Sequence, residues 1–282
     1  MHDRQGVYTP KEVWQMDPQP NAAEGRLADA IRRLGQAGFE TALTGWLRRA
    51  IPCDNLIVLA YRNAGPPLVL YQQADDPKVY GQLDSTYLAG AYLLDPYHDL
   101  HQSRVAAGLY RMRDIAPDQF QRSRYFLDYY RSTGLIDEVA FVAYPAPGVT
   151  LNICLGRDAT SGQVFSTAEV HRASRIAPIV TALSERHWSG LPGPQVAGSG
   201  RGDQAGGLLR AALARSHGIR LSPRQAEVAL LILRGHSSVS IGLRLAVSPQ
   251  TVKVFRRQLY ARCAITTQAE LFALLLPLLK SG

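Results

Sequence analysis

Cysteine is scarce in this chain of 282 residues, which contains only Cys53, Cys154 and Cys263. The three are widely separated and odd in number, so they outline neither a disulfide framework nor the paired ligands of a structural zinc site. We expect three buried thiols in a reducing compartment.

Long hydrophobic runs are also missing. None reaches the roughly 18 apolar residues that a membrane-spanning helix requires. The richest, residues 271–279, is short and contains Pro277. The opening of the chain lacks the pattern of a signal peptide. The sequence therefore favours a cytoplasmic protein that does not contact a membrane.

Catalytic signatures are absent as well. The chain has no G-x-S-x-G, P-loop, H-E-x-x-H or paired-cysteine motif. His98 and His101 favour a surface pair over a metal site, and Asp137-Glu138, at the entry of a strand, favours a solvated role. We expect no enzyme, no catalytic residue, no metal site and no cofactor.

Positive charge is present in excess and is unevenly distributed. The formal net charge is +8, and residues 219–282 alone carry nine Lys or Arg against two Glu, a balance of +7. Charge so concentrated at one end indicates a polyanionic partner for that end rather than a generally basic protein.

The basic end reads as four short helices. A hydroxyl side chain that can cap a helix marks each start, twice with proline at the first helical position. A cation and then glycine, Arg234-Gly235, mark the first stop. The four starts are Ser222-Pro223, Ser237/Ser238, Ser248-Pro249 and Thr266/Thr267.

The third of these helices has two different faces. Val252, Phe255 and Leu259 recur at helical spacing, and the opposite face is cationic. A helix–turn–helix pair with a basic second helix is typical of proteins that enter the DNA major groove, although a solvated basic face on a plain helical bundle is the alternative. The residues predicted to contact DNA are Gln250, Thr251, Lys253, Arg256, Arg257 and Tyr260.

Residues 221–276 resemble the C-terminal DNA-binding domain of the LuxR family of bacterial transcription regulators. The sequence departs from the family at Val239-Ser240, Phe255 and Ala264, where Lys-Glu, histidine and glycine are usual. The matching residues are Leu221, Ser222, Arg224, Glu227, Val228, Gly235, Ser237, Ile241, Leu245, Ser248, Thr251, Val252, Lys253, Leu259, Tyr260, Arg262, Ile265, Thr266, Ala269, Glu270 and Leu271.

The resemblance implies that the protein binds double-stranded promoter DNA as a homodimer, and RNA polymerase is a further candidate partner. The fourth helix is a candidate dimer surface, with packing under the third helix as the alternative for at least half of its leucines. The leucines in question are Leu271, Leu274, Leu275 and Leu278.

The remainder of the chain predicts a fold of class α+β. An antiparallel sheet would have helices on both faces, as in GAF and PAS-like sensors, and the C-terminal domain would be all-α and tetrahelical. The predicted helices are 22–51, 78–94, 117–132 and 167–188, and the predicted strands are 55–61, 67–71, 138–144 and 149–155.

Composition divides the chain into four parts. Residues 1–21 are expected to form a loose arm and residues 22–188 an α+β sensor domain. Residues 189–218, rich in glycine and proline at their start, form a predicted flexible linker with a short helix possible over residues 208–216. Residues 219–282 form the helix–turn–helix domain.

A ligand pocket is predicted around Tyr87, Tyr92, Asp95 and Tyr110. Pockets of this kind combine aromatic walls with a few polar groups. The segment faintly resembles LuxR-type sensors of acyl-homoserine lactones through Asp95-Pro96 and Tyr110, but their Trp and Tyr positions fall near Gln82 and Thr86. We therefore expect another small molecule. In the alternative, Asp95 only caps the end of a helix.

These features predict a transcription regulator whose N-terminal domain senses a small molecule and whose C-terminal domain binds promoter DNA. One alternative is a ligand-independent regulator in which the N-terminal domain serves only dimerisation. The other is a sensor domain with an enzymatic activity that carries no recognised motif.

Overall fold

The computed structural model describes residues 22–62, 65–193 and 204–279. The predicted N-terminal arm and residues 194–203 of the predicted linker lie outside these ranges. Among the described helices, none is both long and apolar enough to cross a membrane.

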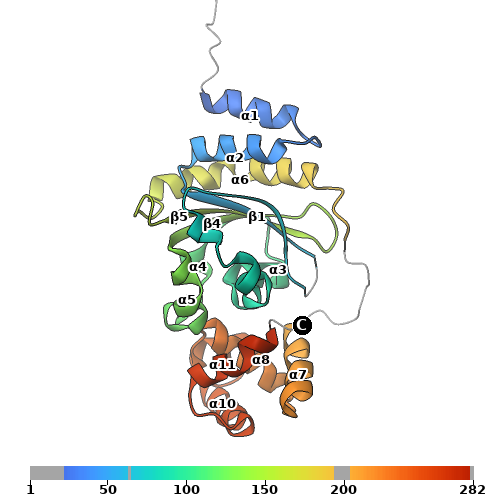
Figure 1. The fold of residues 1–282 in the computed structure, drawn as a ribbon, viewed down its shortest axis with the longest axis vertical. Helices are drawn as coiled ribbons and strands as arrows, with labels where there is room; N and C mark the ends of the chain where they lie inside the picture. The colour runs from blue at the N-terminus through green and yellow to red at the C-terminus, as the bar shows by residue number, and fades with distance from the viewer. Residues whose placement is uncertain (1–21, 63–64, 194–203, 280–282) are drawn as a thin grey trace, which may run out of the picture.

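The N-terminal part is α+β, as the sequence predicts (Figure 1). Helices α1 and α2 fill the predicted helical region 22–51, and Gly38 precedes α2 at the expected break with φ +85°. The elements are α1 (Ala22–Arg32), α2 (Phe39–Ala50), β1 (Asn55–Tyr61), β2 (Leu68–Ala74), η1 (Pro77–Tyr80), η2 (Leu83–Leu88), η3 (Ala91–Leu94), α3 (Pro96–Ser103), β3 (Gly108–Arg111), α4 (Met112–Ile115), η4 (Phe120–Arg122), α5 (Arg124–Asp128), η5 (Tyr130–Thr133), β4 (Leu135–Ala143), β5 (Thr150–Asp158) and α6 (Thr167–His187).

The five strands form one antiparallel sheet in the order β2-β1-β5-β4-β3. Both predicted hairpins are present, and β1 pairs with β5 from Asn55↔Gly156 to Tyr61↔Thr150. The edge strand β3 is not among the predicted strands. Its four residues are too few for an alternating pattern to be visible in the sequence.

The sheet separates two hydrophobic cores. Successive side chains of a strand point to opposite faces, so Leu56 and Val58 of β1 lie in one core and Ile57 and Leu59 in the other. We call the core beneath α2 and α6 the outer core and the core on the opposite face, toward α3 and α5, the inner core (Figure 1). The three cysteines are buried free thiols, as predicted.

Two predicted helices are broken into short turns. Residues 78–94 form η1, η2 and η3, and residues 117–132 form η4, α5 and η5. Gly90 adopts φ +153°, outside the helical region, and Ser123 caps α5 through a 3.1 Å bond from the Phe126 N–H. Their apolar spacing suggested continuous helices, yet both segments turn so that their aromatic residues face the inner core.

The predicted linker is partly helical. Helix α7 (Gln204–His217) occupies its second half and includes the short helix expected there. Leu209 and Leu213 are fully buried, and α7 contacts α8 and α11. The predicted flexible stretch is therefore too long at its C-terminal end, because α7 has apolar residues to bury against the last domain.

The C-terminal part is helical, and helices α8, α9 and α10 begin where the sequence predicts. Three serine hydroxyls accept bonds from the backbone three residues on, at Ser222, Ser237 and Ser248. Ala264, where the family usually has glycine, ends α10 at φ +53°. The helices are α8 (Pro223–Arg234), α9 (Ser238–Leu245), α10 (Pro249–Cys263) and α11 (Gln268–Leu279).

Candidate functional site

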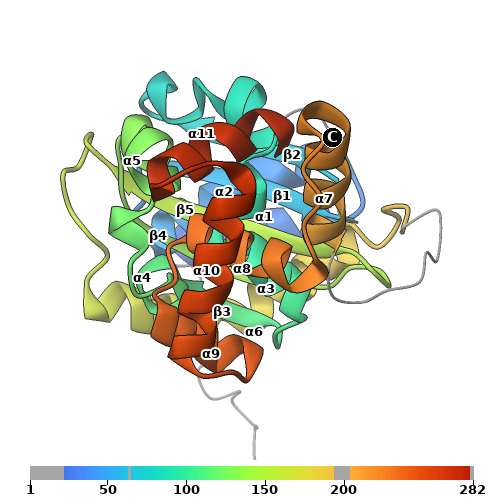
Figure 2. The ribbon, with the colours of Figure 1, turned by 90° about the horizontal axis from the view of Figure 1, so that it is seen from below.

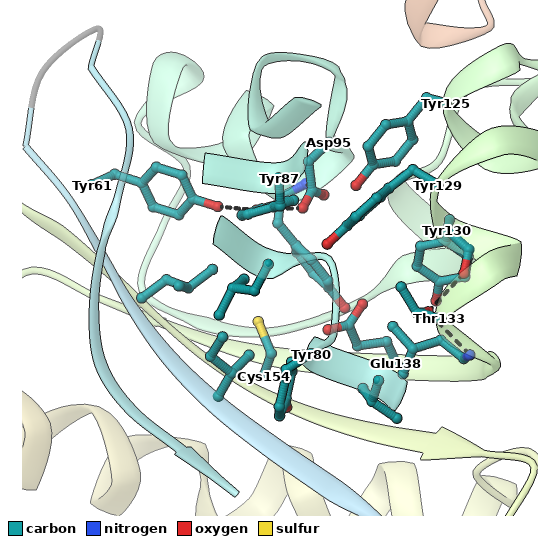
Figure 3. A pocket seen from close by; sticks show the side chains of 16 residues that line it. Tyr61, Tyr80, Tyr87, Asp95, Tyr125, Tyr129, Tyr130, Thr133, Glu138 and Cys154 are labelled. Carbon is teal, nitrogen blue, oxygen red and sulfur yellow. Dashed lines mark hydrogen bonds between the residues drawn. The ribbon is translucent and has the colours of Figure 1, made fainter. Parts of the chain in front are cut away.

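A buried cavity of about 50 Å³ lies in the inner core (Figure 3). The strands β1, β4 and β5 form one wall, and η1, η2, α5 and η5 form the others. Tyrosine dominates the lining. The sixteen lining residues are Ile57, Leu59, Tyr61, Val79, Tyr80, Leu83, Tyr87, Asp95, Tyr97, Tyr125, Tyr129, Tyr130, Thr133, Leu135, Glu138 and Cys154.

Asp95 is fixed in the cavity wall by hydrogen bonds. One carboxylate oxygen accepts the Tyr97 backbone N–H at 2.8 Å, and the other accepts the Tyr87 hydroxyl at 2.7 Å. Tyr87 and Tyr61 share a further bond of 2.8 Å between their hydroxyls. Asp95 is thus the N-cap of α3 and also lines the cavity. Asp95 also ends η3, as the alternative predicts, because its backbone N–H bonds to the Tyr92 carbonyl, and Pro96 then occupies the first position of α3.

The two carboxyl groups of the cavity have raised pKa values. Burial raises the pKa of Asp95 to about 6, although the bonds from Tyr87 and Tyr97 lower it. Burial also raises the pKa of Glu138 well above its usual value, and the charges of Asp95 and Asp137 raise it further. Burial therefore favours the neutral form of both carboxyl groups, and the pKa of Asp95 lies close to neutral pH.

Two of the four predicted ligand-binding residues line the cavity, namely Tyr87 and Asp95. Tyr92 and Tyr110 do not. Tyr92 packs edge-on behind Tyr87, at 6.5 Å between ring centroids, and Tyr110 on β3 donates its hydroxyl to the Ala106 carbonyl at 2.8 Å. Tyr110 is in register with an aromatic residue of the family, but its strand lies at the edge of the sheet, away from the cavity.

The predicted solvated role of Asp137 and Glu138 is wrong. Glu138 lines the cavity, and Asp137 is 4% exposed. Asp137 accepts Arg111 at 2.7 Å, Arg113 at 3.1 Å and the Phe165 N–H at 3.0 Å. The alternation of β4 alone could have shown that the two residues face opposite sides of the sheet, but not that both sides are covered.

The predicted surface pair of histidines is wrong as well. His98 is fully buried, and its ring lies 5.6 Å from that of Tyr61. Burial lowers the pKa of His98 to about 3, so this imidazole stays neutral. Among the described residues, no group of three His, Cys, Asp or Glu side chains could hold a metal ion.

Helix α10 presents the cationic face that the sequence predicts. Lys253, Arg257 and Gln250 are exposed, and the apolar face, with Val252 and Leu259, is fully buried. The other three predicted DNA contacts are more constrained. The Arg256 guanidinium lies over the Tyr260 ring at 5.2 Å and donates to its hydroxyl, while the Thr251 N–H bonds to the Ser248 hydroxyl.

The candidate dimer surface on α11 is partly occupied within the chain. Leu271 and Leu275 are fully buried and Leu274 is half-buried, while the side chain of Leu278 lies outside the described part. Helix α11 contacts α7, α8 and η3 of the N-terminal part. Leu271 and Leu275 therefore pack within the chain.

The α8–α9–α10 arrangement, with a capped turn and an exposed cationic second helix, defines a helix–turn–helix domain. Residues 220–275 match the family described as bacterial regulatory proteins, luxR family. The chain is thus a transcription regulator with a LuxR-family helix–turn–helix domain, which confirms the predicted family of this region.

Three relatives were compared with the chain. A protein described as an HTH-type transcriptional regulator in the exeN 3′ region of Aeromonas salmonicida is 29% identical over 185 residues, which are 64% of this chain and 93% of that protein. The VqsR LBD domain from Pseudomonas aeruginosa is 24% identical with a TM-score of 0.49, over 58% of this chain and 96% of that one. Escherichia coli SdiA is 14% identical with a TM-score of 0.36, over 90% and 98%.

Proposed function

We propose that this protein binds double-stranded promoter DNA through α10 and regulates transcription in response to a small molecule held by its N-terminal domain. The exposed cationic face of α10, next to a correctly capped α9, is the observation that carries the DNA-binding function. Lys253 and Arg257 would contact phosphates and base edges, with Gln250 at the start of the reading helix.

The buried cavity supports sensing over a role in dimerisation alone. A cavity walled by tyrosines and containing two carboxyl groups is suited to a ligand that is partly apolar and partly polar. The proposal places the protein in the cytoplasm as a homodimer that acts with RNA polymerase, and it assigns no catalytic step to the cavity.

The salt dependence of DNA binding tests this function. An operator selected from genomic fragments with the full chain should lose about 10³-fold or more in affinity between 50 and 200 mM salt, because cations that neutralise six or more phosphates in a dimer release as many counterions. The affinity is measured by fluorescence anisotropy. A change of less than about threefold would contradict DNA binding through this basic surface.

A further inference from the structure

The cavity contains acids but no base. Among its sixteen described lining residues there is no lysine, arginine or histidine, while Asp95 and Glu138 both contribute carboxyl groups (Figure 3). Asp95 is 7% exposed and Glu138 is 9% exposed. The cavity wall donates hydrogen bonds to Asp95 from the Tyr87 hydroxyl and the Tyr97 N–H, but it supplies no positive charge to pair with either carboxyl group.

The aromatic side chains also favour a positively charged ligand. Seven tyrosines line the cavity, and the rings of Tyr87, Tyr125 and Tyr129 pack together, with centroid distances of 5.7 Å for Tyr87–Tyr129 and 5.6 Å for Tyr125–Tyr129. The faces of aromatic rings attract cations, and cages of such rings are used to recognise ammonium groups. An anionic ligand would meet repulsion from Asp95 and would find no positive side chain in the cavity.

We propose that the cavity binds a small organic amine, whose ammonium group is held by Asp95 and Glu138 against the tyrosine rings. This inference rests on the proposed sensing function and specifies its class of ligand. Because burial raises the pKa of Glu138, a bound ammonium group would favour its ionised form and so promote release of a proton from it. Because the pKa of Asp95 is about 6, affinity for the amine should fall as the pH is lowered through that value. The other titratable groups that face these carboxyls are the lining tyrosines and Cys154, whose pKa values burial raises, so they stay neutral.

Methylamine, methanol and formate make a set of probes small enough for the cavity that differ chiefly in charge. At pH 7.5 and 10 mM, methylamine should raise the melting temperature of the full chain by about 3 °C, and the alcohol and the acid should each raise it by less than about 1 °C. Titration calorimetry in phosphate and in Tris should give different heats, since binding releases a proton. Asp95→Asn and Glu138→Gln keep the shape of each side chain and should each abolish most of the shift, whereas Asp29→Asn on the exposed surface of α1 should not.

Each other outcome has a definite meaning. An equal or larger shift with methanol or formate overturns the amine class and leaves the sensing function standing. A methylamine shift that survives in both amide variants overturns the assigned site. No shift with any of the three probes overturns the amine proposal, while DNA binding is judged separately by its salt dependence.

A second inference comes from the contacts between the two halves of the chain. Asp99 on α3 bonds to Arg234 at 2.6 Å and to Arg244 at 2.5 Å, and the Arg234 guanidinium also donates to the Leu93 carbonyl. Burial raises the pKa of Asp99, but the charges of the two arginines outweigh it and hold the pKa below its usual value. The ion pair is therefore formed at neutral pH.

A second acidic side chain meets the start of α9. Asp118 accepts the Ser237 backbone N–H at 2.9 Å, and the neighbouring Gln119 N–H donates to the Gly235 carbonyl at 2.9 Å. In helix–turn–helix proteins the helix before the reading helix crosses the DNA backbone, and helix N-termini and arginines are common phosphate contacts. Asp118 and Asp99 thus lie where phosphate oxygens would be expected, at the N-terminus of α9 and at Arg244.

We infer that Asp99 and Asp118 form an acidic latch that holds the helix–turn–helix domain against the N-terminal domain and competes with DNA phosphate. The inference rests on the proposed DNA binding through this domain. Helix α10 lies at the end of the molecule away from the sheet, so the latch restrains the helix before it rather than covering α10 (Figures 1 and 2). Asp99 lies one helical turn beyond Asp95, so the cavity and the latch share α3.

The double variant Asp99→Asn/Asp118→Asn should bind the operator about tenfold more tightly than the wild type. Hydrogen exchange of the Gln119 amide, whose own partner is not altered, should become about tenfold faster because the domain undocks. The matched control is Asp75→Asn/Asp128→Asn, which removes two exposed carboxylates of the N-terminal part, each paired with an arginine of the same part.

An equal gain in affinity in the control would show a general effect of charge and overturn the latch. Faster exchange at Gln119 without tighter binding would show docking that does not restrain DNA binding, and would overturn it too, as would no change in either quantity. If neither the wild type nor any variant binds the operator, the proposed function itself is refuted.

Discussion

Replacing Lys253 and Arg257 together with alanine should weaken operator binding by about 30-fold to 10⁴-fold, because each side chain that reads a base contributes about 1–3 kcal/mol. Both side chains are exposed on α10, and neither is paired with a carboxylate among the described residues, so truncation should remove the proposed contact with DNA and leave the domain core intact. Anisotropy with the selected operator measures the loss.

The control for this variant is Lys78→Ala/Arg175→Ala. Both residues are exposed in the N-terminal part, and the change in net charge is identical. A loss in the control as large as in the α10 variant would indicate attraction by overall charge only. Near-wild-type binding by the α10 variant at low salt would refute this helix as the DNA-reading element. Binding to scrambled DNA distinguishes a base contact from a phosphate contact, because loss of a phosphate contact weakens binding to all sequences equally.

Asp137→Ala should lower the free energy of unfolding of the N-terminal domain by about 3–5 kcal/mol, because it leaves the buried guanidinium of Arg111 without its carboxylate. The Asp137 side chain is 3% exposed and that of Arg111 is 12% exposed, so water can replace little of the lost pairing. The Phe165 N–H would lose its acceptor as well. Urea unfolding followed by tryptophan fluorescence measures the change, since Trp46 and Trp188 are both buried in the outer core.

Arg113→Ala provides the comparison within the same cluster. Its side chain is 47% exposed, so its ion pair with Asp137 should contribute less than about 1 kcal/mol. A loss below about 1 kcal/mol for Asp137→Ala would show that Arg111 finds another partner or reaches solvent. In that event, the Arg111–Asp137 ion pair does not stabilise the packing of β3 against β4.

Local signals were predictable from the sequence and non-local ones were not. The caps at Ser222, Ser237 and Ser248 involve residues three apart, so the helix starts of the C-terminal domain could be identified directly. The latch could not, because Asp99 and Arg234 are far apart in the chain and become neighbours only when the two domains pack.

The cavity shows the same limit. Tyr87 and Asp95 could be predicted because they lie in one aromatic and acidic segment, in which Asp95-Pro96 resembles the LuxR-type sensors. Its other polar group, Glu138, lies on a distant strand, and burial of β4 on both faces depends on β3 and on the turns that replace the predicted helices. Helical spacing in residues 78–94 and 117–132 was real, yet packing around the cavity favoured shorter turns over regular helices.

The division of the N-terminal domain into two cores has a consequence for its evolution. The outer core, formed by α2, α6 and one face of the sheet, buries residues such as Phe39, Leu47 and Phe141 completely and contains no cavity residue. Stability can therefore reside on one face of the sheet while the other face accumulates polar substitutions. Such an arrangement would let new ligand specificities arise by changes in the inner core alone, with the outer core compensating for the burial of groups such as Glu138.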